Sequence, residues 1–255
     1  MIYSTLRAKY KYLRNNCEAK KIFIVGTGRS GTHWIARAIS SHPLVRSTIE
    51  KQPIFGWVKK MALDPSARGC LMPKLIRRYR WQGFLKSPYY YLDKSHPNIW
   101  IVEDLAETFR DAIFIGILRN PFAVVNSMLE HDGVLKWHRR WNEFPVPNRF
   151  LGITKKNRSY YEELPIASKC ALRWKSHKNR IYELDNKIGS RLKVVDYESF
   201  AINTEKTVKE LSKFIGLEDP IPKPKVKKSS LEKWKDGLST MEKEQVSRVI
   251  GGNEG

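Results

Sequence analysis

The sequence predicts an α/β fold, a single domain in which a central parallel sheet is flanked by helices. Two short apolar runs rich in β-branched residues, 21–25 and 112–118, have the composition of buried strands. Each run leads through a turn into a segment whose apolar residues have helical spacing. Strands that alternate with helices in this way form parallel sheets covered on both faces. No internal repeat and no second domain is visible in residues 1–255.

The first strand, residues 21–25, is followed by a glycine-rich turn at 26–31 and by a helix from Thr32 to Ser41. Proline disfavours the helical conformation of the residue before it, so His42-Pro43 ends this helix. A strand, a glycine-rich turn and a helix in succession form the setting that a phosphate-binding loop requires.

The remaining elements continue the alternation of strands and helices. Residues 44–82 show no clear period, and further strands are expected at 83–86, ended by Pro88, and at 192–195. Helices are expected at 103–110, from Pro121 onward, at 166–188, at 204–215 and from about Ser239.

Two segments fall outside this pattern. Residues 1–20 form a short basic lead-in. Residues 131–164 contain prolines, several aromatic residues and no clear period, which predicts an insertion near the acceptor side of the site.

The chain is strongly basic, with 47 Lys and Arg residues against 26 Asp and Glu residues and a net charge of +21. Such a charge favours an anionic partner, either a nucleotide, an acidic glycan or an anionic membrane surface. The sequence contains no zinc-finger spacing, no RNA-binding aromatic motif and no basic zipper, so no specific nucleic acid is expected.

The cysteines and histidines give no sign of a disulfide framework or a metal centre. Cys17, Cys70 and Cys170 lie far apart, and no histidine pair has metal-ligand spacing. The N-terminal segment is charged but is not followed by the apolar region of a secretory signal. We therefore expect a cytoplasmic protein, in a reducing compartment and without a metal cofactor.

The turn at 26–31 has the glycine spacing of a nucleotide phosphate loop. A magnesium-dependent loop would continue after Gly31 with Lys and then Ser or Thr, but Thr32 and His33 stand there. The loop keeps an anion cradle, to which Arg29 adds a planar set of donors, and lacks the groups that act on a γ-phosphate. This pattern favours a nucleotide with a single 5′-phosphate group and no required metal.

A second phosphate site is predicted at Leu118-Arg119-Asn120-Pro121. Arg119 leaves the carboxyl end of a buried strand, where open α/β sheets bind their ligands. Ser127 lies two turns into the next helix, so its hydroxyl and the Arg119 guanidinium can converge on one phosphate.

The segment from Gly26 to Thr32, GTGRSGT, resembles the 5′-phosphosulfate loop of sulfotransferases that use 3′-phosphoadenosine-5′-phosphosulfate (PAPS). Arg119 and Ser127 are similar to the 3′-phosphate motif of the same family. The resemblance covers roughly residues 21–250, with the middle insertion unmatched, and departs from the family at His33, often a second Thr, and at Asn120, commonly Asp. It implies a P-loop-like sulfotransferase fold and transfer of a sulfuryl group from PAPS to a hydroxyl or amine, with release of adenosine 3′,5′-bisphosphate.

The resemblance also assigns the residues that bind the nucleotide. Tyr197, in Val195-Asp196-Tyr197-Glu198, resembles a recurring Tyr-Glu near the nucleotide, and Lys227 and Lys228 belong to a late basic segment that closes over it. The full predicted set is Gly28, Arg29, Ser30, Gly31, Thr32, His33, Arg119, Ser127, Tyr197, Lys227 and Lys228.

Sulfuryl transfer needs a base for the acceptor proton and positive charge on the leaving phosphate. Arg29, Lys86 and the loop amides are expected to stabilise the leaving group. The cytosolic small-molecule sulfotransferases place a catalytic His directly after such a lysine, but Ser87 follows Lys86 here. Glu50 is the predicted base, since tyrosylprotein and carbohydrate-type sulfotransferases resemble this layout; His33 is its rival.

The acceptor predicted from the sequence is a carbohydrate or glycolipid, with a possible peripheral contact to an anionic membrane. The basic surface suits an acidic acceptor, and Trp137, Trp141 and Phe144 in the insertion are candidates for stacking on sugar rings. Two other functions stay open: a magnesium-dependent kinase with a degenerate loop, and a non-catalytic basic module that binds nucleotides or nucleic acid.

Overall fold

The protein is described by a computed structural model that covers residues 18–226 and 229–252. Its centre is a five-stranded sheet with the order β2-β3-β1-β4-β5, in which all paired strands are parallel. The predicted α/β class, one domain with a central parallel sheet flanked by helices, is confirmed. The strands are β1 (Lys21–Gly26), β2 (Val45–Ile49), β3 (Tyr90–Lys94), β4 (Ile113–Leu118) and β5 (Leu192–Asp196).

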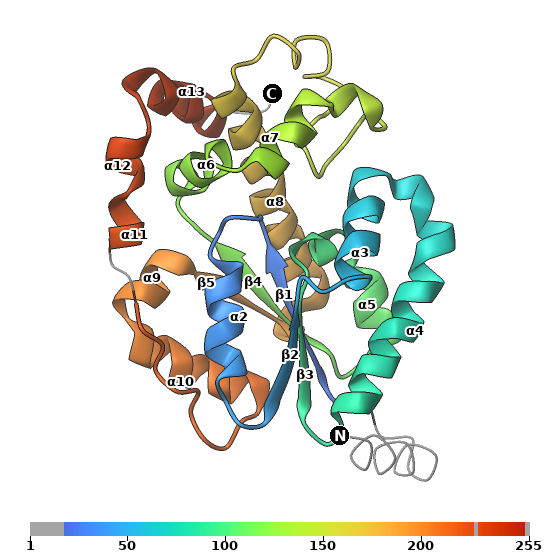
Figure 1. Ribbon diagram of the computed structural model, residues 1–255. Helices are drawn as coiled ribbons and strands as arrows, with labels where there is room; N and C mark the ends of the chain where they lie inside the picture. Colours follow the sequence, from blue (N-terminus) through green and yellow to red (C-terminus); the bar gives the residue numbers. More distant parts are fainter. Residues whose placement is uncertain (1–17, 227–228, 253–255) are drawn as a thin grey trace.

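Helices cover both faces of the sheet (Figure 1). In β1, Ile22 and Ile24 pack under the helices of one face, and Phe23 and Val25 pack under those of the other. This alternation explains why the strand is apolar at every position. The first face carries α2 (Thr32–Ser40), α9 (Tyr197–Ile202) and α10 (Thr204–Ile215), and the second carries α3 (Ile54–Leu63), α4 (Arg68–Lys86), α5 (Val102–Thr108) and α8 (Ile166–Ile188).

Further helices lie beyond the carboxyl ends of the strands, at the top of Figure 1. Val124, Cys170 and Val246 belong to a third core cluster, which joins α6, α8 and α13. The helices of this region are α6 (Pro121–Leu129), α7 (Asp132–Arg139), α11 (Ser229–Glu232), α12 (Trp234–Gly237) and α13 (Thr240–Gly251). The short 3-10 helices of the chain are Pro65–Ala67, His96–Ile101, Trp141–Glu143 and Gly189–Arg191.

The strand expected at 83–86 is wrong, because these residues form the last turn of α4. Leu75, Tyr79 and Gly83 recur every four residues and are buried, as one face of a helix requires. The true third strand, β3, begins only at Tyr90. Residues 44–82, which showed no clear period, contain β2, α3 and most of α4.

The other expected elements are observed close to their predicted bounds. The helix over 166–188 and the helix over 204–215 have the predicted ends, and α13 begins after Ser239, whose side chain forms a capping box with Glu242. Residues 1–17 of the basic lead-in lie outside the described residues. Within the described ranges, no helix is long and apolar enough to cross a bilayer.

The segment 131–164 contains α7, one short 3-10 helix and turns. Its aromatic side chains pack inward: Trp137 meets Phe150 edge-on with 5.2 Å between ring centroids, and Trp141 meets Tyr161 at 5.4 Å. Phe144 packs against the same cluster of buried residues. These contacts give the three partly buried aromatic residues a packing role, and their stacking on sugar rings stays a prediction.

Candidate functional site

Polar side chains follow the carboxyl end of every strand in the sheet. The glycine-rich loop follows β1, Glu50 follows β2, Lys94 ends β3, Arg119 follows β4 and Tyr197 follows β5. Because the strands are parallel, these five ends lie at one edge of the sheet. The parallel sheet therefore brings together segments that are far apart in the chain.

The loop after β1 makes very close contacts with its neighbours. A Cβ on Gly31 would lie 2.2 Å from Cε2 of Tyr197, and Gly31 has a φ of 82°, so only glycine fits there. A Cβ on Gly28 would lie 3.0 Å from Nε2 of His96. Arg29 also has a positive φ, 77°, which turns its side chain out of the loop.

The loop leads directly into the N-terminus of α2. Gly31 is the cap residue of this helix, and no side chain of the described residues caps it. The first amides of a helix have no acceptor within the helix, and the helix dipole makes this end positive. The loop and the helix start together form a site suited to an oxyanion.

The two predicted phosphate motifs meet in the structure. The Nε of Arg29 donates to the hydroxyl of Ser127, at 3.0 Å, and NH1 of Arg119 donates to the carbonyl of Arg29, at 3.2 Å. The two arginines are therefore neighbours in the fold, and that one nucleotide bridges them stays a prediction.

The guanidinium of Arg119 is positioned by an aromatic ring and a carboxylate. It lies 4.3 Å from the centre of the Tyr197 ring, and its Nε lies 3.8 Å from Glu198. Burial lowers the pKa of Arg119, while Tyr197 and Glu198 favour its charged form. Its Nε is buried, faces Glu198 and has no hydrogen-bond partner among the described residues.

The residue after Arg119 departs from the common family pattern without a structural penalty. The side chain of Asn120 accepts a hydrogen bond from the amide of Ala123, at 3.2 Å, and so caps the start of α6. Asn and Asp are comparable in this capping role.

The chain after residue 220 approaches the same space. The carbonyl of Lys225 accepts a hydrogen bond from the indole of Trp34, at 3.1 Å, and the carbonyl of Ser230 accepts one from Arg119, at 2.9 Å. Lys227 and Lys228, predicted to bind the nucleotide, lie between these two positions but outside the described residues.

A compact cluster of four ionisable side chains lies beside the loop. Glu50 Oε1 accepts a hydrogen bond from Lys94 and lies 3.0 Å from Nδ1 of His96, and Glu50 Oε2 lies 3.6 Å from Nε2 of His33. The Nζ of Lys94 is also 3.0 Å from Nδ1 of His33. Glu50 has a φ of 48°, a conformation that non-glycine residues adopt mainly where the surroundings impose it. The structure thus brings both predicted base candidates, Glu50 and His33, together with two residues that the sequence analysis did not select.

The charges in this cluster are fixed by burial and by mutual contacts. Burial alone would raise the pKa of Glu50, but the hydrogen bond with His96 and the charge of Lys94 lower it to about 2. Burial lowers the pKa of His96 to about 3, although Glu50 opposes this, and burial likewise lowers the pKa of Lys94. At neutral pH, Glu50 is therefore ionised and His96 is neutral.

Neutral His96 is oriented as a proton acceptor. With Nδ1–H donated to the ionised Glu50, the lone pair of His96 is on Nε2. This Nε2 is buried, faces Gly28 and has no hydrogen-bond partner among the described residues. The pair of Glu50 and His96 is the arrangement of a base whose orientation is set by a carboxylate.

Lys86 is not part of this site. It is the last residue of α4 and lies near the amino end of β3, at the edge of the sheet opposite to the glycine-rich loop (Figure 1). Lys94 occupies the place that was expected of Lys86. The signal for it was Lys94-Ser95-His96 at the end of β3, and the incorrect strand at 83–86 hid it.

Comparisons with known proteins agree with this architecture. Residues 21–220 match the model of the "Sulfotransferase family". The fold is similar to the sulfotransferase domain of the curacin biosynthetic pathway, with a TM-score of 0.60, 12% identity and coverage of 92% of this chain and 98% of that one. It is also similar to the sulfotransferase domain of the Synechococcus PCC 7002 olefin synthase, with a TM-score of 0.58, 14% identity and coverage of 94% and 98%.

A third solved structure, the sulfotransferase STF9 from Mycobacterium avium, has a TM-score of 0.51 at 11% identity, with coverage of 98% of this chain and 79% of that one. A comparison with curated protein sequences finds no significant match. At these identities the solved structures show the fold.

Proposed function

The chain belongs to the sulfotransferase family, and on this premise we propose that it transfers the sulfuryl group of PAPS to a hydroxyl or amine of an acceptor. Adenosine 3′,5′-bisphosphate is the second product. The observation that carries the proposal is the contact of Arg29 with Ser127 and of Arg119 with the Arg29 backbone. A nucleotide with phosphates at both its 5′ and 3′ positions suits two anion sites on one space.

Each end of the nucleotide has its own group of ligands in this proposal. The 5′-phosphosulfate is bound by the amides and hydroxyls of the segment 28–33 and by Arg29. The 3′-phosphate is bound by Arg119 and Ser127. Tyr197 supports both groups, because its ring contacts Gly31 on one side and Arg119 on the other. Lys227 and Lys228 remain proposed ligands through the family resemblance.

We propose that His96 is the base that takes the proton of the acceptor and that Glu50 is its carboxylate partner. Oε1 of Glu50 already accepts a hydrogen bond from Lys94 and lies 3.0 Å from Nδ1 of His96, so this carboxylate is engaged within the cluster. His96 has a free Nε2 and, once protonated, gains the attraction of the Glu50 carboxylate. The predicted base Glu50 thereby becomes the residue that orients and stabilises the base.

The transfer step follows from these positions. The acceptor oxygen gives its proton to Nε2 of His96 and forms a bond to sulfur, while the bond from sulfur to the phosphate oxygen breaks. The electron pair of that bond leaves with the bisphosphate. We assign the stabilisation of the leaving oxygen to Arg29 and Lys94, two cations close enough for the charge of Arg29 to lower the pKa of Lys94.

The acceptor class proposed here is an acidic carbohydrate or glycolipid, and its support is the net charge of +21. A peripheral contact with anionic membranes is supported by α4, which carries Lys and Arg but no Asp or Glu. Lys74, Arg77 and Arg80 are on its exposed side, and Trp81 is 42% exposed. A basic helix with an exposed Trp is suited to a membrane surface.

Two experiments test the proposal. Calorimetric titration measures the binding of adenosine 3′,5′-bisphosphate and of ATP to the purified chain. A transfer assay follows label from PAPS to glycan, lipid and phenol acceptors. Binding of the bisphosphate but not of ATP, with transfer to at least one acceptor, is expected. Equal binding of ATP, or no binding of either nucleotide, would refute the proposed function.

A further inference from the structure

A buried arginine on α8 has no ionic partner. Arg173 is 0% exposed, and none of its three guanidinium nitrogens has a hydrogen-bond partner among the described residues. Burial lowers its pKa to about 10, so it still carries its charge at neutral pH. An unpaired charge in the protein interior is costly, and buried charges are normally paired.

The same helix shows how a buried arginine is normally satisfied. Arg180, about two turns further along α8, is 5% exposed and binds the carboxylate of Glu103. It also donates to Glu183, at 3.2 Å, and to the carbonyl of Ile99, at 3.1 Å. Arg180 and Arg173 are both buried on α8, but only Arg180 has carboxylate partners among the described residues.

Aromatic rings hold the Arg173 guanidinium in place. It lies 4.5 Å from the centre of the Phe150 ring and 5.1 Å from that of Trp137. These contacts orient the charge but leave its N–H groups without acceptors. The fixed, planar set of donors is suited to a carboxylate, phosphate or sulfate.

Two histidines nearby add further unsatisfied polar atoms. His138 is held through Nδ1 by the hydroxyl of Tyr161, at 2.8 Å, and His177 through Nδ1 by the carbonyl of Arg173, at 2.8 Å. The Nε2 atoms of both are buried without a partner among the described residues. Burial, and then the charge of Arg173, lowers the pKa of His138 to about 3, and the same two causes lower the pKa of His177 well below its ordinary value.

This cluster adjoins the proposed catalytic centre. Trp174, the next residue of α8, donates from its indole to the carbonyl of Arg119, at 3.0 Å, so this turn lies over the end of β4. The charge of Arg173 also contributes to the lowered pKa of His96, after burial and the charge of Lys94.

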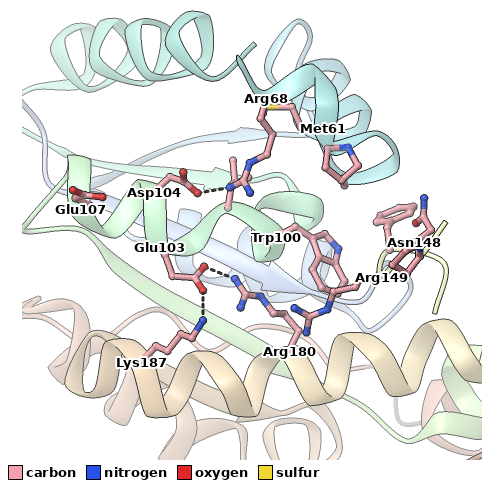
Figure 2. Close-up of a pocket in the computed structure, with 15 residues that line it drawn as sticks. Met61, Arg68, Trp100, Glu103, Asp104, Glu107, Asn148, Arg149, Arg180 and Lys187 are labelled. Carbon is pink, nitrogen blue, oxygen red and sulfur yellow. Dashed lines mark hydrogen bonds and ion pairs between the residues drawn. The ribbon is translucent and has the colours of Figure 1, made fainter. Parts of the chain in front are cut away.

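On its other side, the cluster borders a cavity of about 550 Å³ (Figure 2). Trp100 and Phe150 line this cavity, and the same two rings contact His177, with centroid distances of 5.0 and 5.5 Å. Figure 2 shows Arg149 and Arg180 beside Trp100, whose ring centre lies 5.1 and 6.0 Å from their guanidinium carbons, and Lys187 beside Glu103. Phe150 separates this part of the cavity wall from Arg173, since its ring lines the cavity and its centre lies 4.5 Å from the guanidinium.

We propose that Arg173 binds an oxyanion of the acceptor, so that the sulfated group belongs to a molecule that is already acidic. This inference rests on the proposed sulfuryl transfer. A carboxylate, phosphate ester or sulfate ester on the acceptor would be the anionic partner of Arg173, which has no hydrogen-bond acceptor among the described residues. An acceptor without such a group leaves the buried charge unpaired, and it is rejected for this reason.

Anion titrations of the purified chain test this inference, with and without saturating adenosine 3′,5′-bisphosphate. Sodium sulfate, phosphate or acetate is added against sodium chloride at equal ionic strength, and the unfolding temperature is measured for the wild type, Arg173→Met and Arg173→Gln. We expect at least one oxyanion to raise the unfolding temperature of the wild type by about 2–4 °C more than that of either variant. The rise in unfolding temperature with acetate, compared with that in sulfate and phosphate, shows whether the site prefers a carboxylate or a tetrahedral oxyanion.

Arg180→Met is the matched control, since it removes a buried arginine that has partners. It should lower the unfolding temperature in chloride because it removes the ion pair with Glu103 and the hydrogen bonds to Glu183 and to the carbonyl of Ile99, whereas Arg173→Met should leave that temperature unchanged or raise it. Identical oxyanion responses in the wild type and both Arg173 variants would overturn the inference. So would a loss of stability in Arg173→Met as large as that in Arg180→Met.

The bisphosphate titration separates this inference from the proposed function. Failure of the wild type to bind adenosine 3′,5′-bisphosphate counts against the sulfotransferase proposal. Normal bisphosphate binding without an Arg173-dependent oxyanion response counts against the acceptor inference alone.

Discussion

The Nε of Arg29 donates to the hydroxyl of Ser127 across 3.0 Å, although 98 positions separate the two residues in the chain. Arg29 belongs to the loop after β1 and Ser127 to the helix after β4. Because β1 and β4 are paired neighbours in the sheet, their carboxyl ends bring the two side chains together. This contact brings the two predicted phosphate motifs side by side, and the first two predictions depend on it.

Removal of the Arg119 guanidinium should weaken binding at one end of the nucleotide only. A charge-assisted hydrogen bond contributes about 1.5–3 kcal/mol, so Arg119→Met should reduce the affinity for adenosine 3′,5′-bisphosphate by about 10–100-fold. The affinity for adenosine 5′-phosphate, which has no 3′-phosphate, should change little. Calorimetric titration measures both affinities, with Lys209→Met on the exposed side of α10 as the control. An equal loss of affinity for both nucleotides would mean that Arg119 does not bind the 3′-phosphate.

Gly31→Ala should disrupt the phosphate loop. The new methyl group would lie 2.2 Å from the Tyr197 ring, at a backbone φ of 82°. Gly189 also has a positive φ, 48°, but a Cβ there meets nothing within 4 Å. Gly189→Ala should therefore cost about 1–3 kcal/mol of stability through its backbone conformation and leave bisphosphate binding intact. Gly31→Ala should abolish that binding, as measured by calorimetry beside urea unfolding.

The elements whose signals are local were predictable from the sequence. β1, β4, α8 and α10 follow from apolar runs or helical spacing with a glycine at the end, and both anion motifs lie at strand-to-helix turns. The segment 44–86 was not predictable in the same way, because α4 is basic on its exposed side and has Pro73 in its first turns. Its helical face is visible only once Leu75, Tyr79 and Gly83 are known to be buried together.

That one error determined which site residues were missed. With the third strand placed at 83–86, Lys86 and Ser87 appeared to stand at the end of a strand, and Lys94 and His96 were passed over. Glu50 was found through the resemblance to tyrosylprotein and carbohydrate-type sulfotransferases. Its partners Lys94 and His96 come from the end of β3 and the residues after it, so their distances from Glu50 depend on the strand order. The burial of Arg173 without a carboxylate depends wholly on tertiary packing, and no local pattern indicates it.

Acid should destabilise the protein through its buried histidines. The pKa of His96 is lowered from 6.5 to about 3, so the unfolded chain binds this proton more readily than the folded chain. The resulting stability is fully present above pH 6.5 and is lost as the pH falls from about 6.5 toward 3. At pH 5 the loss from His96 alone is about 2 kcal/mol.

Urea unfolding at pH 7 and pH 5 measures this effect. The free energy of unfolding should fall less steeply between these two values in His96→Asn than in the wild type. His131→Asn is the control, because His131 is exposed at the start of α7, where its side chain caps the helix and Asn can do the same. A slope unchanged by His96→Asn would mean that His96 is charged in the folded protein.

Three substitutions distinguish the roles of His96, Glu50 and His33 in proton transfer. If His96 is the base, His96→Asn should lower kcat for sulfuryl transfer by about 10²–10⁴-fold with unchanged bisphosphate affinity. Glu50→Gln should lower kcat less, because the imidazole remains but loses the carboxylate that orients it and favours its protonated form. The double variant should be no slower than His96→Asn, since both residues act in one step. His33, whose side chain is 49% exposed, is the competing candidate for the base. If His96 is the base, His33→Asn should retain most of the activity. Full activity in His96→Asn, with a loss confined to His33→Asn or Glu50→Gln, would transfer the role of base to the residue whose removal abolishes transfer.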